Sequence, residues 1–137
     1  MANGPDPSAC SSHAAMQALG SYDGGKMLFL GLGTGLGSAM ISDGTVIPLE
    51  LAHLPYRHGK SYEEYVGAAG RTKLGNRRWR KHVLDIVDLF VAAFLVDYVV
   101  LGGGNAKHMT QVPRNVRIGD NRNAFRGGFR LWDDRHL

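Results

Sequence analysis

Residues 26–51, KMLFLGLGTGLGSAMISDGTVIPLEL, decide the fold. Two apolar runs are separated by a glycine-rich turn. A third follows Asp43-Gly44, a dipeptide that favours a tight turn between antiparallel strands. Pro48 lacks a backbone N–H and therefore belongs at a sheet edge or a bulge. The stretch predicts a meander of three strands, over residues 26–32, 38–41 and 45–51.

The rest of the chain alternates helices and strands. Ser61-Tyr62-Glu63-Glu64 is a capping box that predicts the start of a helix, which later glycines keep short or broken. Apolar residues at helical spacing predict a long helix over residues 77–95. The run DYVVL at 97–101 predicts a strand buried on both faces. Beyond it we expect a short helix capped by Asn105 and reaching Met109, an edge strand at 116–118 and a last helix at 121–132.

The length of 137 residues fits one domain. Residues 1–12 are small, polar and proline-containing, so we expect a disordered lead or a cloning remnant there, and a single domain over 13–137. A three-strand meander followed by alternating helices and strands is the ribonuclease-H-like layout. This layout is also the half-unit of the actin-like ATPase fold. The predicted class is α/β, a mixed sheet flanked by helices.

Composition excludes several classes of protein. Cys10 is the only cysteine, which excludes an intrachain disulfide framework and every multi-cysteine zinc motif, and we expect no metal ligands. The most apolar stretch, 83–101, contains three aspartates and is therefore no membrane span. The first twenty residues contain no apolar segment typical of a secretory signal. We expect a cytoplasmic protein that does not bind membranes.

The formal net charge is +4, and much of the excess lies in two segments. Residues 71–81 contain six Lys or Arg and no acid, and residues 107–130 are rich in arginine. Such segments suit polyanions, although a solvated helix face and a basic tail are the more ordinary explanation of them. Nuclease activity is not expected, because the first strand carries no acid to bind metal ions. Nucleic-acid binding without catalysis stays an alternative, through Arg77, Arg78, Arg80 and Lys81.

The glycine-rich turn GLGTGLG, residues 31–37, is a candidate phosphate site. Successive backbone N–H groups in such a turn can form an anion-binding concavity, and the hydroxyl of Thr34 adds a donor. The turn lacks the Gly-Lys-Ser/Thr of a Walker loop and fits the dinucleotide fingerprint poorly. A tight hairpin that merely needs glycine is the alternative. The candidate phosphate-binding residues are Gly33, Thr34, Gly35 and Gly37.

Two further motifs could bind a small ligand. A buried strand delivers three glycines to a helix start in VVLGGGNAK, residues 99–107, where ligands of α/β sheets often bind. The candidate nucleotide-binding residues are Gly102, Gly103, Gly104 and Asn105, with a plain strand-to-helix turn as the alternative. Glu50 and His53 follow the third strand and could bind sugar hydroxyls, the carboxylate accepting and the imidazole donating. An ordinary surface pair is the alternative for them.

These motifs together resemble the ROK family of sugar kinases, above all its polyphosphate/ATP glucokinases. Residues 32–39 (LGTGLGSA) are similar to the second phosphate-binding motif of that family. Glu50-Leu51-Ala52-His53 resembles its Glu-x-Gly-His sugar motif, with Ala52 where glycine is usual, and residues 101–104 (LGGG) resemble its adenosine-side motif. The resemblance covers about residues 14–133. It implies the C-terminal lobe of such a kinase, a sugar ligand, and ATP or polyphosphate with magnesium.

The sequence departs from the family in its catalytic parts. Family members have two lobes, and the first opens with an Asp-x-Gly-x-Thr phosphate hairpin that no segment here matches. Ser12 and His13 stand where the family has an Asn-Asp pair whose aspartate is the catalytic base. We therefore expect no catalytic residue, with His13 in the position of the aspartate. The cysteine-rich zinc motif of many members is also absent.

We accordingly expect a truncated sugar-kinase-like domain that retains a surface for nucleotide or polyphosphate and for sugar but is not a kinase alone. A severed lobe exposes apolar surface, which favours a homodimer or pairing with a separately encoded N-terminal lobe. The alternative is a non-catalytic regulatory module, or one that binds nucleic acid or another polyanion.

Overall fold

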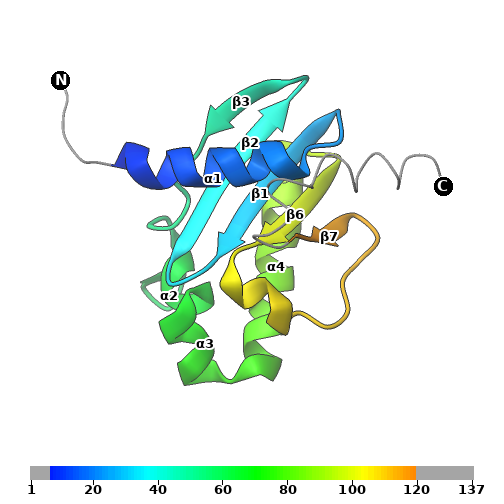
Figure 1. The fold of residues 1–137 in the computed structure, drawn as a ribbon. Coiled ribbons are helices and arrows are strands. Elements are labelled where there is room, and N and C mark those ends of the chain that lie inside the picture. The colour runs from blue at the N-terminus through cyan, green and yellow to red at the C-terminus, as the bar shows by residue number, and fades with distance from the viewer. Residues whose placement is uncertain (1–6, 120–137) are drawn as a thin grey trace.

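A five-stranded mixed sheet forms the centre of the molecule (Figure 1). The computed structural model describes residues 7–119, and the strand order is β3-β2-β1-β6-β7. Pairs β1–β2 and β2–β3 are antiparallel, whereas β1–β6 and β6–β7 are parallel. The elements are α1 (Pro7–Ser21), β1 (Lys26–Leu32), β2 (Leu36–Ser42), β3 (Thr45–Pro48), β4 (Pro55–Arg57), β5 (Lys60–Ser61), α2 (Tyr62–Val66), α3 (Ala68–Leu74), α4 (Asn76–Phe94), β6 (Tyr98–Gly102), the 3₁₀ helix η1 (Gly104–His108) and β7 (Val116–Ile118).

The predicted meander is confirmed, with a shorter third strand. Asp43 and Gly44 both have positive φ, 50° and 84°. A tight turn between antiparallel strands requires such values. Strand β3 is an edge strand and ends at Pro48 instead of continuing to residue 51. Beyond Pro48 a side chain takes over from the backbone hydrogen bonds between β2 and β3. The Oγ of Ser38 in β2 donates there to the carbonyl of Leu49 (3.1 Å).

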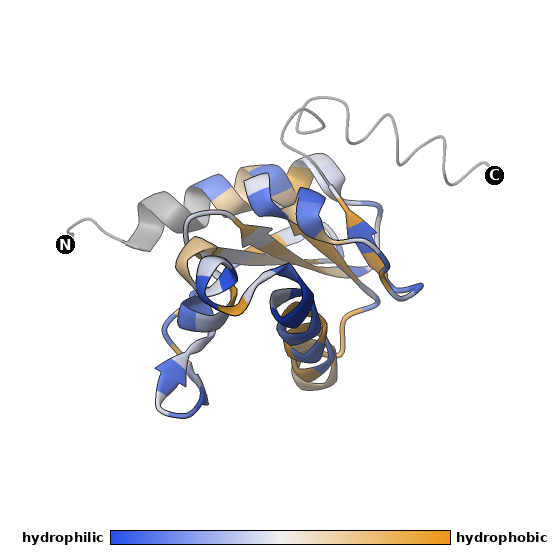
Figure 2. Ribbon diagram, turned by 90° about the horizontal axis from the view of Figure 1, so that it is seen from below, coloured by the Kyte–Doolittle hydropathy of each residue, from blue (hydrophilic) through white to orange (hydrophobic). Residues whose placement is uncertain are grey.

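The sheet is covered on both faces (Figure 2). Alternation along β1 sends Met27 and Phe29 into the cluster beneath α1, while Leu28 and Leu30 enter the larger cluster beneath α4. Strand β6 lies between β1 and β7 and is buried along its whole length, as its continuous apolar run predicts. The mixed α/β class with helices flanking the sheet is therefore confirmed.

Helix α4 matches its prediction within one residue at each end. Its buried side chains repeat at helical spacing and face the sheet; they are Trp79, Val83, Ile86, Val87 and Phe90. The indole Nε1 of Trp79 donates to the carbonyl of Val66 (3.0 Å), which joins α4 to α2. Trp79 is thus a core residue, as its position on the apolar stripe indicated. Within the described range, no helix combines the length and the apolar character that a membrane crossing requires.

The N-terminal helix is longer than expected. Helix α1 begins at Pro7, so residues 7–12, which the sequence assigns to a disordered lead, are helical. The helix packs on the sheet through small residues, since Ala14 and Ala18 are buried in the cluster beneath it. Residues 1–6 and the helix predicted at 121–132 lie outside the described residues.

The hairpin of β4 and β5 was not predicted. His58 and Gly59 form its turn with φ of 52° and 72°. This is the same turn chemistry as in Asp43-Gly44. The capping box that follows is confirmed: Ser61 Oγ accepts from the N–H of Glu64, whose carboxylate accepts from the N–H of Ser61. The hairpin carries the chain from the sheet edge to α2.

Candidate functional site

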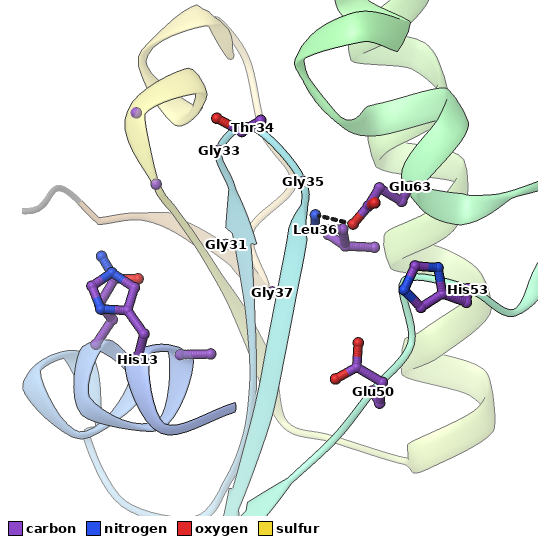
Figure 3. Close-up of a pocket in the computed structure, with 14 residues that line it drawn as sticks. His13, Gly31, Gly33, Thr34, Gly35, Leu36, Gly37, Glu50, His53 and Glu63 are labelled. Atoms are coloured by element: carbon purple, nitrogen blue, oxygen red, sulfur yellow. Dashed lines mark hydrogen bonds between the residues drawn. The ribbon is translucent and has the colours of Figure 1, made fainter. Parts of the chain in front are cut away.

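A cleft of about 650 Å³ opens where the β1–β2 turn meets α1, α2 and the end of β6 (Figure 3). It brings together residues of all three predicted motifs, which lie far apart in the chain, from Gly33 to Gly104. The predicted residues that line it are Gly33, Thr34, Gly35, Gly37, Glu50, His53, Gly103 and Gly104, together with His13. Gly102 and Asn105 lie next to this lining.

The glycines of the β1–β2 turn differ in whether the surrounding structure requires a glycine at their position. The N–H of Gly33 donates to the carbonyl of Gly35 (3.1 Å), which closes the turn and leaves Thr34 exposed at its tip. A Cβ on Gly35 would lie 2.6 Å from Oε1 of Glu63, so a side chain there would displace this carboxylate from the N–H of Leu36. A Cβ on Gly33 would meet nothing within 4 Å. Packing therefore does not require a glycine at position 33, and the absence of a side chain there leaves open space in the cleft.

The three glycines after β6 differ in the same way. A Cβ on Gly102 would lie 2.6 Å from the ring of Phe29, and Gly103 has a φ of 85° and lies against the backbone of Leu32. Both are needed for the fold. Gly104 is exposed, lines the cleft and has open space where a Cβ would point.

The prediction that Asn105 caps a helix is wrong. The residue before η1 is Gly103, and no side chain caps this 3₁₀ helix. The amide Nδ2 of Asn105 donates instead to the carbonyl of Gly33 (3.1 Å). Asn105 therefore joins the two glycine motifs. The reason is tertiary, since the β1–β2 turn lies within reach of the asparagine and offers an acceptor.

Glu50 and His53 lie on the segment that leaves β3, and both side chains are exposed on one wall of the cleft (Figure 3). Ser38 holds this segment, since its Oγ contacts both the carbonyl of Leu49 (3.1 Å) and the N–H of Leu51 (3.4 Å). The two candidate sugar ligands are thus placed by a buried serine of β2. They project into the same cleft as the phosphate-turn glycines.

Glu63 is a cleft residue that the sequence reasoning missed. Its Oε1 accepts from the N–H of Leu36 (3.0 Å), and its own N–H donates to the carbonyl of Ala52 (3.0 Å). It therefore links the β1–β2 turn to the segment that bears His53. Its Oε2 accepts no hydrogen bond from the described residues. Only its place after a capping serine was visible in the sequence, and that indicates a helix start and no more.

His13 lies on α1, across the cleft from Glu50 and His53 (Figure 3). Its side chain is exposed, and Gln17, one turn further along α1, also lines the cleft. His13, which the resemblance aligns with the family's catalytic aspartate, thus faces the candidate sugar ligands across the cleft. Among residues 7–119, no three His, Cys, Asp or Glu side chains come together as a metal site would need.

The β4–β5 hairpin is fixed to α4 by an aromatic contact. The hydroxyl of Tyr56 lies 3.0 Å from Nδ1 of His82, and Tyr62 and Tyr65 pack against the Tyr56 ring. Burial lowers the pKa of His82 below its usual range, and the charge of Arg57 lowers it further. Burial raises the pKa of Tyr56. A neutral imidazole therefore holds the hairpin that begins shortly after His53.

Known proteins that are similar to this chain include sugar kinases. No family model matches the chain. It is 34% identical over 88 residues to the polyphosphate glucokinase of Mycobacterium tuberculosis strain H37Ra, an alignment that covers 62% of this chain and 33% of that enzyme. The chain is thus homologous to polyphosphate glucokinases and spans a third of the length of this one.

Solved structures of sugar kinases share the fold. The inorganic polyphosphate/ATP-glucomannokinase of Arthrobacter sp. strain KM matches 90% of this chain and 55% of its own, with a TM-score of 0.69 and 23% identity. A ROK-family glucokinase of Streptomyces griseus, solved with glucose and AMPPNP, matches 86% of this chain and 65% of its own, with a TM-score of 0.58 and 12% identity. The fold is therefore that of ROK-family sugar kinases, and this chain matches about half of the length of such a kinase.

Proposed function

We propose, from this homology to polyphosphate glucokinases, that the chain is the sugar- and phosphate-binding lobe of a hexose kinase. It binds a hexose and either ATP or polyphosphate in one cleft, and it phosphorylates the sugar only together with a second lobe. One observation carries the proposal: Glu50 and His53 share a cleft of about 650 Å³ with Gly33, Thr34 and Gly104.

The sugar side consists of acceptors and one donor. Glu50 and Glu63 offer carboxylate oxygens that accept from sugar hydroxyls, and His53 can donate from a ring nitrogen. Oε2 of Glu63 is free of protein donors among the described residues, whereas its Oε1 is held by Leu36. A hexose, with hydroxyls spaced around a ring, suits acceptors that come from two different segments. The ligand class we propose is therefore a neutral sugar.

The donor side consists of backbone and one hydroxyl. Thr34 lies at the tip of the turn, and Gly33 and Gly104 leave room for phosphate oxygens to approach the main chain. Magnesium commonly keeps several waters and binds through substrate phosphates. Since the described residues offer no cluster of three ligands, the ion would be held chiefly by the donor's phosphates.

Phosphoryl transfer depends on positioning and on a base that accepts the sugar proton. Glu50, His53 and the β1–β2 turn line one cleft, which supports a common site in which the two substrates would meet. No aspartate lines it among the described residues, and His13 faces it instead. We propose that a second lobe supplies the base and closes over the phosphates.

Calorimetric titration with glucose and with tripolyphosphate tests the proposal. Glu50→Gln should weaken glucose binding by at least about tenfold, because a hydrogen bond to a charged acceptor is replaced by a neutral one. The same variant should leave tripolyphosphate binding unchanged. Asp88→Asn removes one exposed carboxylate of α4 outside the cleft and serves as the control. The absence of binding heat for both ligands would refute the proposed function.

A further inference from the structure

A second cavity, with a volume of about 270 Å³, lies among β5, α2 and α3. No residue that lines it also lines the cleft. Helix α2 contributes to both spaces, since Glu63 lines the cleft whereas Glu64 and Tyr65 line the second cavity. We refer to the second cavity as the α2–α3 pocket.

The less exposed part of the lining of the α2–α3 pocket is apolar. Tyr65 and Leu74 are half-buried there, and Gly70 is buried. A Cβ on Gly70 would clash with two backbone carbonyls of α2, so the two helices pack closely at this point. The ring of Tyr65 is held from outside the lining, with its centroid 4.9 Å from that of Tyr56 and 4.8 Å from that of His82. An apolar group of a ligand therefore meets a surface that is already formed.

The exposed part of the lining carries charges of both signs, on Lys60, Glu64 and Lys73. The three groups are near one another: hydrogen bonds from Ser61 lower the pKa of Glu64, and the charges of the two lysines lower it further. Yet neither lysine forms an ion pair within residues 7–119, where both ion pairs involve arginines. The two ammonium groups and the carboxylate therefore line the pocket without neutralising one another by direct contact.

The carboxylate of Glu64 is already oriented. Its Oε2 accepts from the N–H of Ser61 (3.0 Å), as part of the capping box. Its Oε1 accepts no hydrogen bond from the described residues. A carboxylate that is held through one oxygen can bind an ammonium group through the other with little further loss of side-chain freedom.

We propose that the α2–α3 pocket binds a free α-amino acid with an aliphatic side chain. The ligand's carboxylate pairs with the ammonium groups of Lys60 and Lys73, its ammonium group pairs with Glu64, and its side chain packs against Tyr65 and Leu74. A simple anion would meet the like charge of Glu64, and a simple cation would meet two lysines. An inorganic ion would leave the apolar part of the lining without a partner. A zwitterion with an apolar group is thus the class of ligand that uses every part of the lining.

Backbone NMR titration of the full chain with leucine tests this inference. Leucine should shift the amide signals of Tyr65, Ala69 and Leu74 most strongly. Three analogues each lack one of its groups: 4-methylpentanoate lacks the ammonium group, 3-methylbutylamine lacks the carboxylate, and glycine lacks the side chain. Each should bind at least about fivefold more weakly than leucine, because it loses one ion pair or one apolar contact. Binding of any analogue as tight as that of leucine would overturn the inference.

Two variants separate the charged groups of the pocket. Glu64→Gln keeps an acceptor for the N–H of Ser61, so the capping box remains. It should weaken leucine binding about fivefold and leave 4-methylpentanoate binding at least as tight as before. Lys73→Gln should weaken the binding of leucine and of 4-methylpentanoate but not that of 3-methylbutylamine. Lys73 is exposed and makes no described hydrogen bond, so the melting temperature should stay constant.

Lys81→Gln removes the same charge from the exposed face of α4, outside the pocket, and should leave leucine binding unchanged. A loss in this control as large as in Lys73→Gln, or unchanged leucine binding in Glu64→Gln, would overturn the inference. Because the pocket and the cleft share no residue, glucose binding without leucine binding would overturn the inference and leave the proposed function intact. Leucine binding without glucose or tripolyphosphate binding would support the pocket and refute the proposed function.

Discussion

Gly33 and Gly103 both line the cleft, yet the backbone requires only one of them to be glycine. Gly103 has a φ of 85°, and a Cβ there would lie 2.7 Å from the backbone of Leu32. Gly103→Ala should therefore lower the free energy of unfolding by about 1–3 kcal/mol, measured by urea denaturation. Gly33→Ala should leave stability within about 0.5 kcal/mol and weaken tripolyphosphate binding, because its methyl group would occupy the space for a phosphate. Equal destabilisation by both variants would contradict this division.

For single residues, the sequence predicted which residues share the cleft better than it predicted the contacts that each of them makes. The predicted residues that do share a cleft are Gly33, Thr34, Glu50 and His53. Their motifs follow strands of a meander, in which each strand pairs with the next one in the chain. Glu63 and Asn105 could not be assigned in this way. Their roles depend on hydrogen bonds to Leu36 and Gly33, far away in the chain, and only the packing of α2 and η1 against the turn creates them.

The stability of helix α2 depends on the side chain of its N-cap residue, Ser61. Ser61→Ala removes the acceptor of the Glu64 N–H. It should cost about 1 kcal/mol of unfolding free energy. Thr72→Ala on the exposed side of α3 is the matched control and should change stability far less. A loss in Ser61→Ala no greater than that of the control would show that the cap contributes nothing.

The same cap produces a dependence on acid pH. The backbone N–H and side chain of Ser61 lower the pKa of Glu64 below its usual value of 4.5. Because the folded pKa is depressed, this stabilisation is present above about pH 4.5 and is lost as the pH falls through the folded pKa. Wild type should therefore lose stability in that window relative to Glu64→Gln. Parallel pH profiles for the two proteins would contradict the linkage.

The hairpin of β4 and β5 should respond to pH in a higher range. Burial and Arg57 lower the pKa of His82 from 6.5, so protonation disfavours the fold and stability falls as the pH drops below about 6.5. Histidine NMR should give His82 a titration midpoint below 6.5, and Arg57→Gln should move it upward. Tyr56→Phe removes the contact with His82 and should loosen the segment that carries His53, which weakens glucose binding. An unshifted His82 midpoint would contradict this description.

Elements with strong periodic patterns were predictable and short ones were not. The spacing of apolar residues alone predicted helix α4 and strand β6, and the Asp43-Gly44 dipeptide predicted the turn. The β4–β5 hairpin escaped prediction because its strands have three and two residues and contain one large apolar side chain, Tyr56, which packs against Tyr62 and Tyr65 of α2. His58 adopts a conformation that asparagine or aspartate usually signals in such a turn.

At the scale of the whole molecule, α1 presents an exposed apolar stripe beside the cleft. Met16 and Leu19 are 70% and 54% exposed, and they lie on the helix that carries His13 to the cleft. We expect the second lobe, or a second copy, to cover this stripe. Light scattering should then show concentration-dependent association that Met16→Gln/Leu19→Gln abolishes. Leu89→Gln, on the exposed face of α4, is the control and should leave association unchanged; a monomer at all concentrations would contradict the expectation.

The central claim is that one lobe holds sugar and phosphate ligands in a single cleft, and backbone NMR tests it most directly. Glucose should shift the amide signals of Glu50, His53 and Glu63, and tripolyphosphate should shift those of Gly33, Thr34 and Gly104. Each ligand should also cause smaller shifts in the other set, since both sets line one cavity. Shifts confined to other surfaces, or the absence of shifts with both ligands, would contradict the account.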